Sequence, residues 1–98
     1  MAIIQLTEPL GPRITRLAFL NRFTDAEAIA IDLASIGETV EAATLRRYMA
    51  KVNAATYIDL TREDTRAGVQ ALEVMGILGS GRAEEILSEV VDPSEVPQ

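Results

Sequence analysis

The stretch FTDAEAIAIDLASIG, residues 23–37, constrains the fold more than any other part of the sequence. Thr24 precedes Glu27 by three residues, which is the spacing of a capping box. In that motif the threonine hydroxyl accepts from the amide of the glutamate, and the carboxylate accepts from the amide of the threonine. Gly37 suits the other end, because glycine readily takes the left-handed conformation that ends many helices. The sequence predicts a helix between these signals, with one apolar stripe facing the core: Ile29, Leu33 and Ile36.

Four other segments show helical spacing of apolar residues. Pro12 suits the first position of the first of them, with Gly11 as a permissive cap. A further helix is expected from about Val40 to Ala55, and the next one is expected to be capped by Thr61 or Asp64 and to end near Met75. Ser80 is expected to cap the last. The residues expected to face inward are Ile14, Leu17, Ala18, Phe23 or Leu20, then Leu45, Tyr48, Met49 and Val52, then Val69, Leu72 and Met75, and finally Ala83, Ile86, Leu87 and Val90.

The glycines of the second half carry two different predictions. Gly68 lies in the middle of a predicted helix, where glycine costs about 1 kcal/mol relative to alanine, so we expect a close helix crossing there. Gly76, Gly79 and Gly81 form a joint that faintly resembles a phosphate-binding loop. Such a loop needs a preceding strand and usually a lysine, whereas here a predicted helix precedes the glycines and Arg82 follows them. The joint is therefore expected to be a turn between two helices.

Composition places the chain among small, mainly helical domains. Its 98 residues allow one domain, and with two Phe, two Tyr and no Trp the core must come mostly from aliphatic side chains. The expected fold is mainly α: a compact bundle of four or five short helices. A minor two-stranded β element from residues 3–6 and 56–60 is left open. The expected organisation is an extended arm or short strand over 1–12, a helical domain over 13–91 and a flexible acidic tail over 92–98.

The same composition argues against most site chemistry. The chain has no Cys and no His, so thiolate ligands and the commonest acid–base group near neutral pH are missing. Acidic pairs such as Glu84-Glu85 are adjacent in a helix and do not face each other. We therefore expect no enzyme activity, no cofactor and no metal. The net charge of −6 argues against nucleic acid, and no apolar stretch reaches the roughly 20 residues of a membrane helix.

Candidate contact residues lie in two places. Ile3 and Ile4 form a short β-branched run that could add to the sheet edge of a partner. Arg46, Arg47 and Lys51 form a basic group, which Arg13, Arg16 and Arg22 could extend. This group would suit an acidic partner or the acidic C-terminal segment of a neighbouring copy. The alternative is a solvated face whose ion pairs are each worth less than about 1 kcal/mol.

A regulatory function is the alternative to a structural one. The segment TREDTRAGVQALEVMGIL could be the recognition helix of a winged-helix protein, presenting Arg62, Arg66 and Gln70 to bases. Against this, GSGRAEEILSEVV predicts an acidic helix where a hairpin wing should follow, and its carboxylates would repel phosphate. The alternative retained is a small regulatory protein that binds DNA or a host factor.

Two stretches, ITRLAFLNRFTDAEAIAIDLAS and AATYIDLTREDTRAGVQALEVMGILGSGRAEEIL, resemble a group of small proteins of tailed bacteriophages and prophages. Members of this group are encoded among virion or tail genes and lack a recognised catalytic motif. The resemblance implies a structural or accessory function in particle assembly, with another phage structural protein or a second copy as partner. It also implies production in the cytoplasm of a bacterial host, with incorporation into the virion left open. No secretory signal is expected at the N-terminus.

Overall fold

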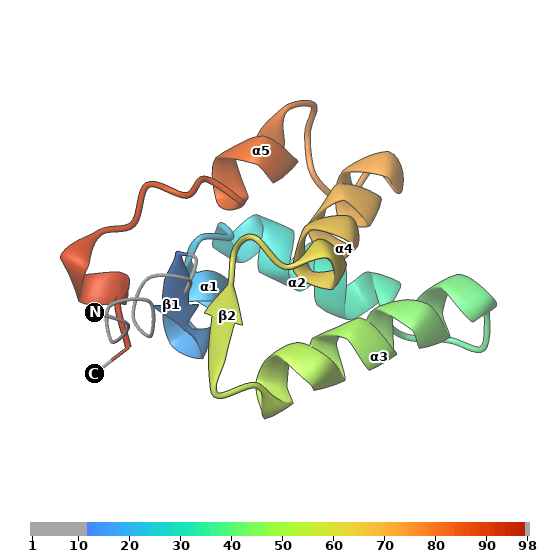
Figure 1. Ribbon diagram of the computed structural model, residues 1–98. Helices are drawn as coiled ribbons and strands as arrows, with labels where there is room; N and C mark the ends of the chain where they lie inside the picture. The colour runs from blue at the N-terminus through green and yellow to red at the C-terminus, as the bar shows by residue number, and fades with distance from the viewer. Residues whose placement is uncertain (1–11, 98) are drawn as a thin grey trace.

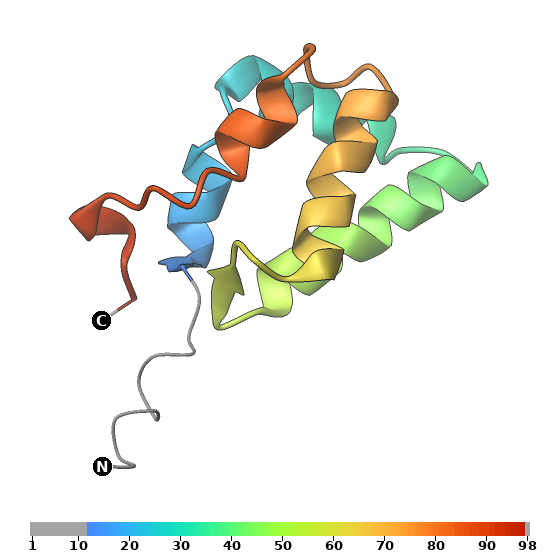
Figure 2. The same cartoon turned by 45° about the horizontal axis from the view of Figure 1, so that its top comes forward.

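The computed structural model describes residues 12–97, which form the mainly helical domain that the sequence predicts (Figure 1). In chain order its elements are β1 (Arg13–Thr15), α1 (Arg16–Asn21), α2 (Asp25–Ala34), α3 (Val40–Ala54), β2 (Tyr57–Asp59), α4 (Glu63–Val74), α5 (Arg82–Ile86) and a 3-10 turn, η2 (Pro93–Glu95). The two views place α4 between α3 and α5 (Figures 1 and 2). In both views α1 and the two short strands lie close together, to the left of α4. The mainly α prediction with a minor β element is confirmed.

One strand of the β element, β2, lies within the predicted segment 56–60, and in the described chain it pairs with β1. β1 and β2 are antiparallel, with Ile14 opposite Ile58, and the amide of Leu60 extends the pairing by donating to the carbonyl of Pro12. The predicted partner, residues 3–6, lies outside the described residues. The prediction of a helix beginning at Pro12 is wrong, because the helix begins only at Arg16. Thr15 caps it with its hydroxyl, which accepts from the amide of Ala18.

The core is built from side chains of both strands and of all five α-helices. Phe19 and Phe23 meet edge to face with ring centroids 5.5 Å apart, a preferred geometry for aromatic pairs. Phe19 is fully buried although the predicted stripe omitted it, and Leu17, which was predicted inward, is exposed. The other side chains of the core cluster are Ile14, Ile31, Leu45, Val52, Ile58, Leu60, Val69, Leu72, Leu78, Ala83, Ile86 and Leu87.

The capping box of α2 is confirmed. The prediction of which face of α2 points to the core is wrong. Ile29, Leu33 and Ile36 are 58, 65 and 72% exposed, and Ile31 is the buried residue of this helix. The inward face combines Ile31 with smaller or polar side chains at the equally helical spacing i, i+3, i+4, i+7: Glu27, Ala30, Ile31 and Ala34. Two apolar patterns thus coexist in α2, and the pattern of larger side chains faces outward.

The close helix crossing predicted at Gly68 is confirmed. A Cβ atom at this position would lie 2.0 Å from Cε1 of Tyr48, so the aromatic ring from α3 occupies the space that any side chain would need. The Tyr48 hydroxyl donates to the carbonyl of Thr65 at 3.1 Å, which fixes the ring across α4. Burial, with a smaller effect from the negative charge of Asp64, raises the pKa of this hydroxyl well above its usual value. Tyr48 therefore remains a neutral donor.

The joint after α4 is the turn between helices that the sequence predicts, but its caps differ. Gly76 and Gly81 have φ of +82° and +83°, the region that favours glycine. Ser80 does not cap α5, and neither Thr61 nor Asp64 is the N-cap of α4. The carboxylate of Glu73 instead accepts from the amide of Ala83 at 2.9 Å. Two residues predicted to face inward, Met75 and Val90, are exposed.

Candidate functional site

The contact residues predicted from sequence do not form one patch. Ile3 and Ile4 lie outside the described residues. Arg47 and Lys51 are exposed on α3, whereas Arg46 turns to the end of α2. Its Nη1 donates to the carbonyls of Ser35 and Gly37 at 2.7 and 2.8 Å. Arg46 thus supplies the polar partner that helix C-termini require.

The three other arginines that could have extended the basic group contact their own chain. Arg13 lies over the ring of Tyr57, with its guanidinium carbon 4.1 Å from the centroid. Arg16 donates to the carbonyls of Asn53 and Ala55 after α3. Arg22 is nearly buried against the C-terminal segment. These arginines therefore hold the fold together rather than forming a continuous basic face.

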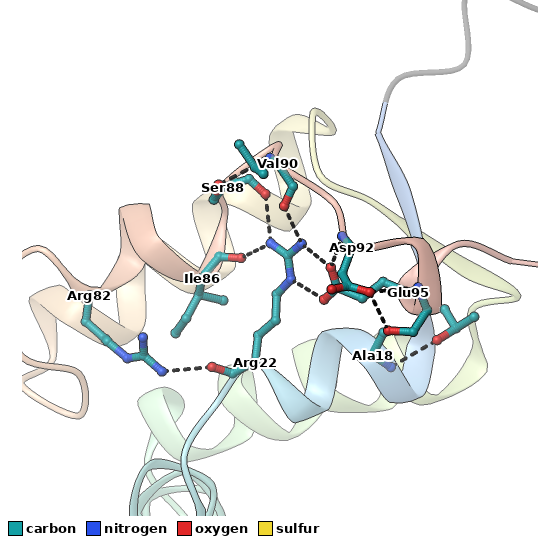
Figure 3. Close-up of polar contacts among 10 residues, drawn as sticks. Ala18, Arg22, Arg82, Ile86, Ser88, Val90, Asp92 and Glu95 are labelled. Atoms are coloured by element: carbon teal, nitrogen blue, oxygen red, sulfur yellow. Dashed lines mark hydrogen bonds and ion pairs between the residues drawn. The ribbon is translucent and has the colours of Figure 1, made fainter.

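Arg22 uses all five of its donors within the chain (Figure 3). Nη1 donates to the carbonyls of Ile86 and Ser88 at 2.8 and 2.7 Å, and Nη2 donates to that of Val90 at 3.3 Å. Nε and Nη2 bind the two carboxylate oxygens of Glu95, each at 2.9 Å. Such a bidentate pair is among the stronger ion pairs in proteins. Arg22 therefore anchors the chain after α5 to α1.

The acidic tail predicted over 92–98 is attached to the domain through this pair. Asp92 caps the turn η2, where its carboxylate accepts from the amide of Ser94 at 2.9 Å. Arg22 lowers the pKa of Glu95, which keeps that carboxylate charged. The acidic segment that was expected to meet a basic group of a neighbouring copy meets Arg22 of its own chain. The described part of the tail is thus held at Glu95 instead of being the free segment that the sequence predicts.

Arg82 makes the reciprocal connection from α5 back to the turn before α2. Its Nη2 donates to the carbonyl of Arg22 at 2.8 Å (Figure 3). Its Nε and Nη2 also bind the carboxylate of Glu27 at 2.7 and 3.1 Å. Glu27 simultaneously closes the capping box of α2 by accepting from the amide of Thr24. We call Arg22, Arg82, Glu27 and Glu95 the arginine clamp.

The clamp makes stability depend on pH in the acid range. Arg82 is the main cause of the lowered pKa of Glu27. Because the pKa is lowered on folding, the pair contributes stability above the ordinary value of 4.5, and this contribution is lost as the pH falls through the lowered value. We expect Glu27→Gln to lower the free energy of unfolding by about 1–2 kcal/mol at pH 7, because the amide carries no charge and has one acceptor oxygen where the carboxylate offers Arg82 two. Urea unfolding over a series of decreasing pH measures this, and the difference between wild type and variant should shrink as the pH falls through the lowered pKa of Glu27.

Glu84→Gln is the matched control for this experiment. Glu84 is exposed on α5, and its substitution is expected to change stability by less than about 0.5 kcal/mol. A loss for Glu27→Gln that stays the same across the whole acid range in which wild type remains folded would contradict the electrostatic account of the clamp.

Across residues 12–97 no buried side-chain nitrogen or oxygen lacks a hydrogen-bond partner, and no cluster of acidic residues could hold a metal ion. An open groove lies between α1 and η2, and most of its polar lining residues already take part in the clamp or the caps. It is lined by Thr15, Leu17, Ala18, Asn21, Arg22, Asp92, Ser94 and Glu95. No helix of the described chain is both long and apolar enough to cross a membrane.

The surface of α4 gives little support to base recognition. Arg62 is exposed but pairs with Asp64 at 2.9 Å, and Arg66 donates to the carbonyl of Leu60. Gln70 is exposed as well. In the described part of the chain, the helix α5 follows α4 where a winged-helix protein has its hairpin.

Three exposed large apolar side chains lie on one face of α2. We call Ile29, Leu33 and Ile36 the α2 stripe. Ile36 lies just past the helix, but its amide donates to the carbonyl of Leu33 at 3.2 Å, so the helical spacing continues to it. The next element begins with Val40, which is also exposed. The stripe is therefore an apolar surface on a peripheral helix.

Comparison with known proteins adds no relative: the chain matches no family model, no curated protein and no solved structure.

Proposed function

We propose that the chain is a non-enzymatic interaction protein that acts in phage particle assembly through the α2 stripe. The observation that carries the proposal is the outward direction of the larger apolar side chains of α2. A helix that is apolar on both faces is normally buried on both. In this chain one face contacts the core and the other faces solvent, so a second protein surface would complete the burial.

The stripe is favoured over the basic side chains as the contact site, because most of those side chains already have partners within the chain. The arginine clamp is satisfied within the chain, and Arg13 and Arg16 contact their own backbone or ring partners. Contiguous exposed apolar residues mark protein contacts more often than isolated ones do. Arg47 and Lys51, exposed on α3, would supply polar contacts outside the apolar surface.

The assignment to phage assembly rests on the sequence resemblance to small proteins encoded among virion or tail genes. Within that setting the partner is another phage structural protein or a second copy. The protein would be produced in the cytoplasm of the bacterial host. It would then act either as a component of the virion or as an assembly factor that leaves before the particle is complete.

Deletion of the gene from a phage or prophage that carries it tests this function. We expect the yield of complete particles to fall, and mass spectrometry of purified particles then separates a virion component from an assembly factor. An unchanged yield of normal particles, with the protein missing from them, would contradict both forms of the proposal.

The regulatory alternative makes a different prediction. A DNA-binding protein would shift duplex DNA at low salt, and the binding would weaken steeply as salt is added. We expect no such shift, since the chain carries a net charge of −6.

A further inference from the structure

We propose that the α2 stripe binds the same surface of a second copy of this chain, with the two α2 helices packed antiparallel about a twofold axis. The proposal rests on the proposed function and names the partner for the same surface. The charges at the two ends of α2 are what select a second copy in this orientation.

The beginning of α2 carries an exposed carboxylate on the side of the stripe. Asp25 precedes Ile29 by four residues, and Ile29 precedes Leu33 by four, so the three side chains share one face. Asp25 is exposed and lies in the first turn, where a negative charge also complements the helix dipole.

The end of α2 carries a guanidinium group. Arg46 reaches from α3 and is bound through Nη1 to the carbonyls on either side of Ile36. Among residues 12–97 its Nε and Nη2 have no hydrogen-bond partner, so three donors remain free at this end of the stripe. A carboxylate is the acceptor that matches such donors best.

An antiparallel pair brings these two ends together twice. Asp25 of each copy approaches Arg46 of the other, and the apolar stripes meet between the two ion pairs. The helix dipoles are also opposed, which is the favourable arrangement. A parallel pair would place Asp25 beside Asp25 and Arg46 beside Arg46. Since a twofold interface requires a self-complementary surface, this pattern of charges fits the antiparallel dimer.

The size of the surface sets the expected strength. A ten-residue helix is about 15 Å long, so a single helix pair buries less than the roughly 800 Å² per partner of standard stable complexes. We therefore expect a weak dimer in rapid exchange, which forms at high local concentration such as that of an assembling particle.

Sedimentation velocity over a concentration series is the first test. The full-length chain is expected to shift from monomer to dimer as its concentration rises. Leu33→Gln is expected to weaken the dimer at least tenfold, whereas Val74→Gln is expected to leave it unchanged. Val74 is the control because it is also an apolar, exposed residue, and it lies on α4 instead of α2. Thermal unfolding of both variants should stay within a few degrees of wild type, since neither side chain is in the core.

Disulfide trapping tests the orientation, and the chain has no cysteine of its own to interfere. In the antiparallel pair, position 29 of one copy lies opposite position 36 of the other. We expect a mixture of Ile29→Cys and isotope-labelled Ile36→Cys chains to form mixed disulfide dimers in preference to either homodimer. Preferential homodimers would indicate the parallel pair and overturn the proposed geometry.

The remaining outcomes separate this proposal from the function on which it rests. A chain that stays monomeric at millimolar concentration would overturn the dimer. If such a monomer bound a purified phage structural protein, and Leu33→Gln abolished that binding, the proposed function would stand with a different partner. Dimers that form equally well with Leu33→Gln would also overturn the proposal, because they would use another surface.

Discussion

Gly68→Ala is expected to lower the free energy of unfolding by about 1–3 kcal/mol, a typical cost of overpacking a core. The added Cβ would meet the ring of Tyr48, with Cε1 at 2.0 Å and Cζ at 2.3 Å. The ring has to move away, and the hydrogen bond from its hydroxyl to Thr65 is strained or lost with it. Helix propensity alone predicts the opposite sign, because alanine is favoured over glycine by about 1 kcal/mol in a helix. Thermal denaturation decides between the two effects, with a shift of about 4–8 °C for each kcal/mol.

Gly79→Ala is the control for Gly68→Ala. Nothing lies within 4 Å of a Cβ added at Gly79, and this residue is not among the glycines with positive φ. We expect its substitution to change stability by less than about 0.5 kcal/mol. In a Tyr48→Ala background the cost of Gly68→Ala should largely vanish, because the clashing ring is gone. A melting temperature for Gly68→Ala equal to or above that of wild type would contradict the close crossing.

Arg22→Met is expected to lower the free energy of unfolding by about 2–4 kcal/mol. Methionine keeps much of the aliphatic stem but none of the five hydrogen bonds. The Glu95 carboxylate loses its cation, and the carbonyls of Ile86 and Ser88 lose a charged donor in partly buried surroundings. Chemical denaturation followed by circular dichroism measures the change.

Two comparisons show which part of this loss comes from the C-terminal segment. A chain ending at Val91 lacks Glu95 but keeps the carbonyls of Ile86 and Ser88, so we expect it to lose less stability than Arg22→Met. Arg47→Met removes an exposed arginine and is expected to cost less than about 0.5 kcal/mol. If Arg22→Met were as stable as Arg47→Met, the arginine clamp would not contribute to holding the fold.

The parts of the fold that depend on local signals could be predicted from the sequence. The capping box at Thr24 requires only residues three apart, and the apolar stripe of α3 has a single consistent phase. The close helix crossing at Gly68 could be predicted, because a glycine inside a strong helical pattern usually marks a place where another part of the chain comes close to the helix. The identity of the side chain that fills the space, Tyr48, required the structure.

Which face of α2 points to the core could not be predicted, because apolar residues recur at helical spacing on two of its faces. Size alone favours the stripe of Ile29, Leu33 and Ile36 as the inward face. The competing face contains Glu27, which a sequence pattern counts as polar and therefore outward. The structure directs this face inward because Arg82, 55 residues further along the chain, binds the Glu27 carboxylate. Such a distant ion pair has no local signature.

The same reason explains the missed contacts of the C-terminal segment. Arg22 and Glu95 are 73 residues apart, and nothing near either residue indicates the other. The two prolines and the acidic charge of the tail suggest a free segment, whereas one bidentate ion pair is enough to hold it. The basic group around Arg46 was misjudged in a similar way, since Arg16 and Arg46 bind backbone carbonyls of their own chain instead of joining one basic surface.

The central claim is that the chain works through the α2 stripe, and complementation measures this most directly. A phage or prophage lacking the gene is supplied with the wild-type chain, with Leu33→Gln or with Val74→Gln, and the yield of complete particles is counted. Both variants are expected to fold and to reach the wild-type level in the cell. We predict that the wild type and Val74→Gln restore the yield and that Leu33→Gln does not. Full restoration by a folded Leu33→Gln chain, and by a chain with all three stripe residues replaced by glutamine, would contradict the claim.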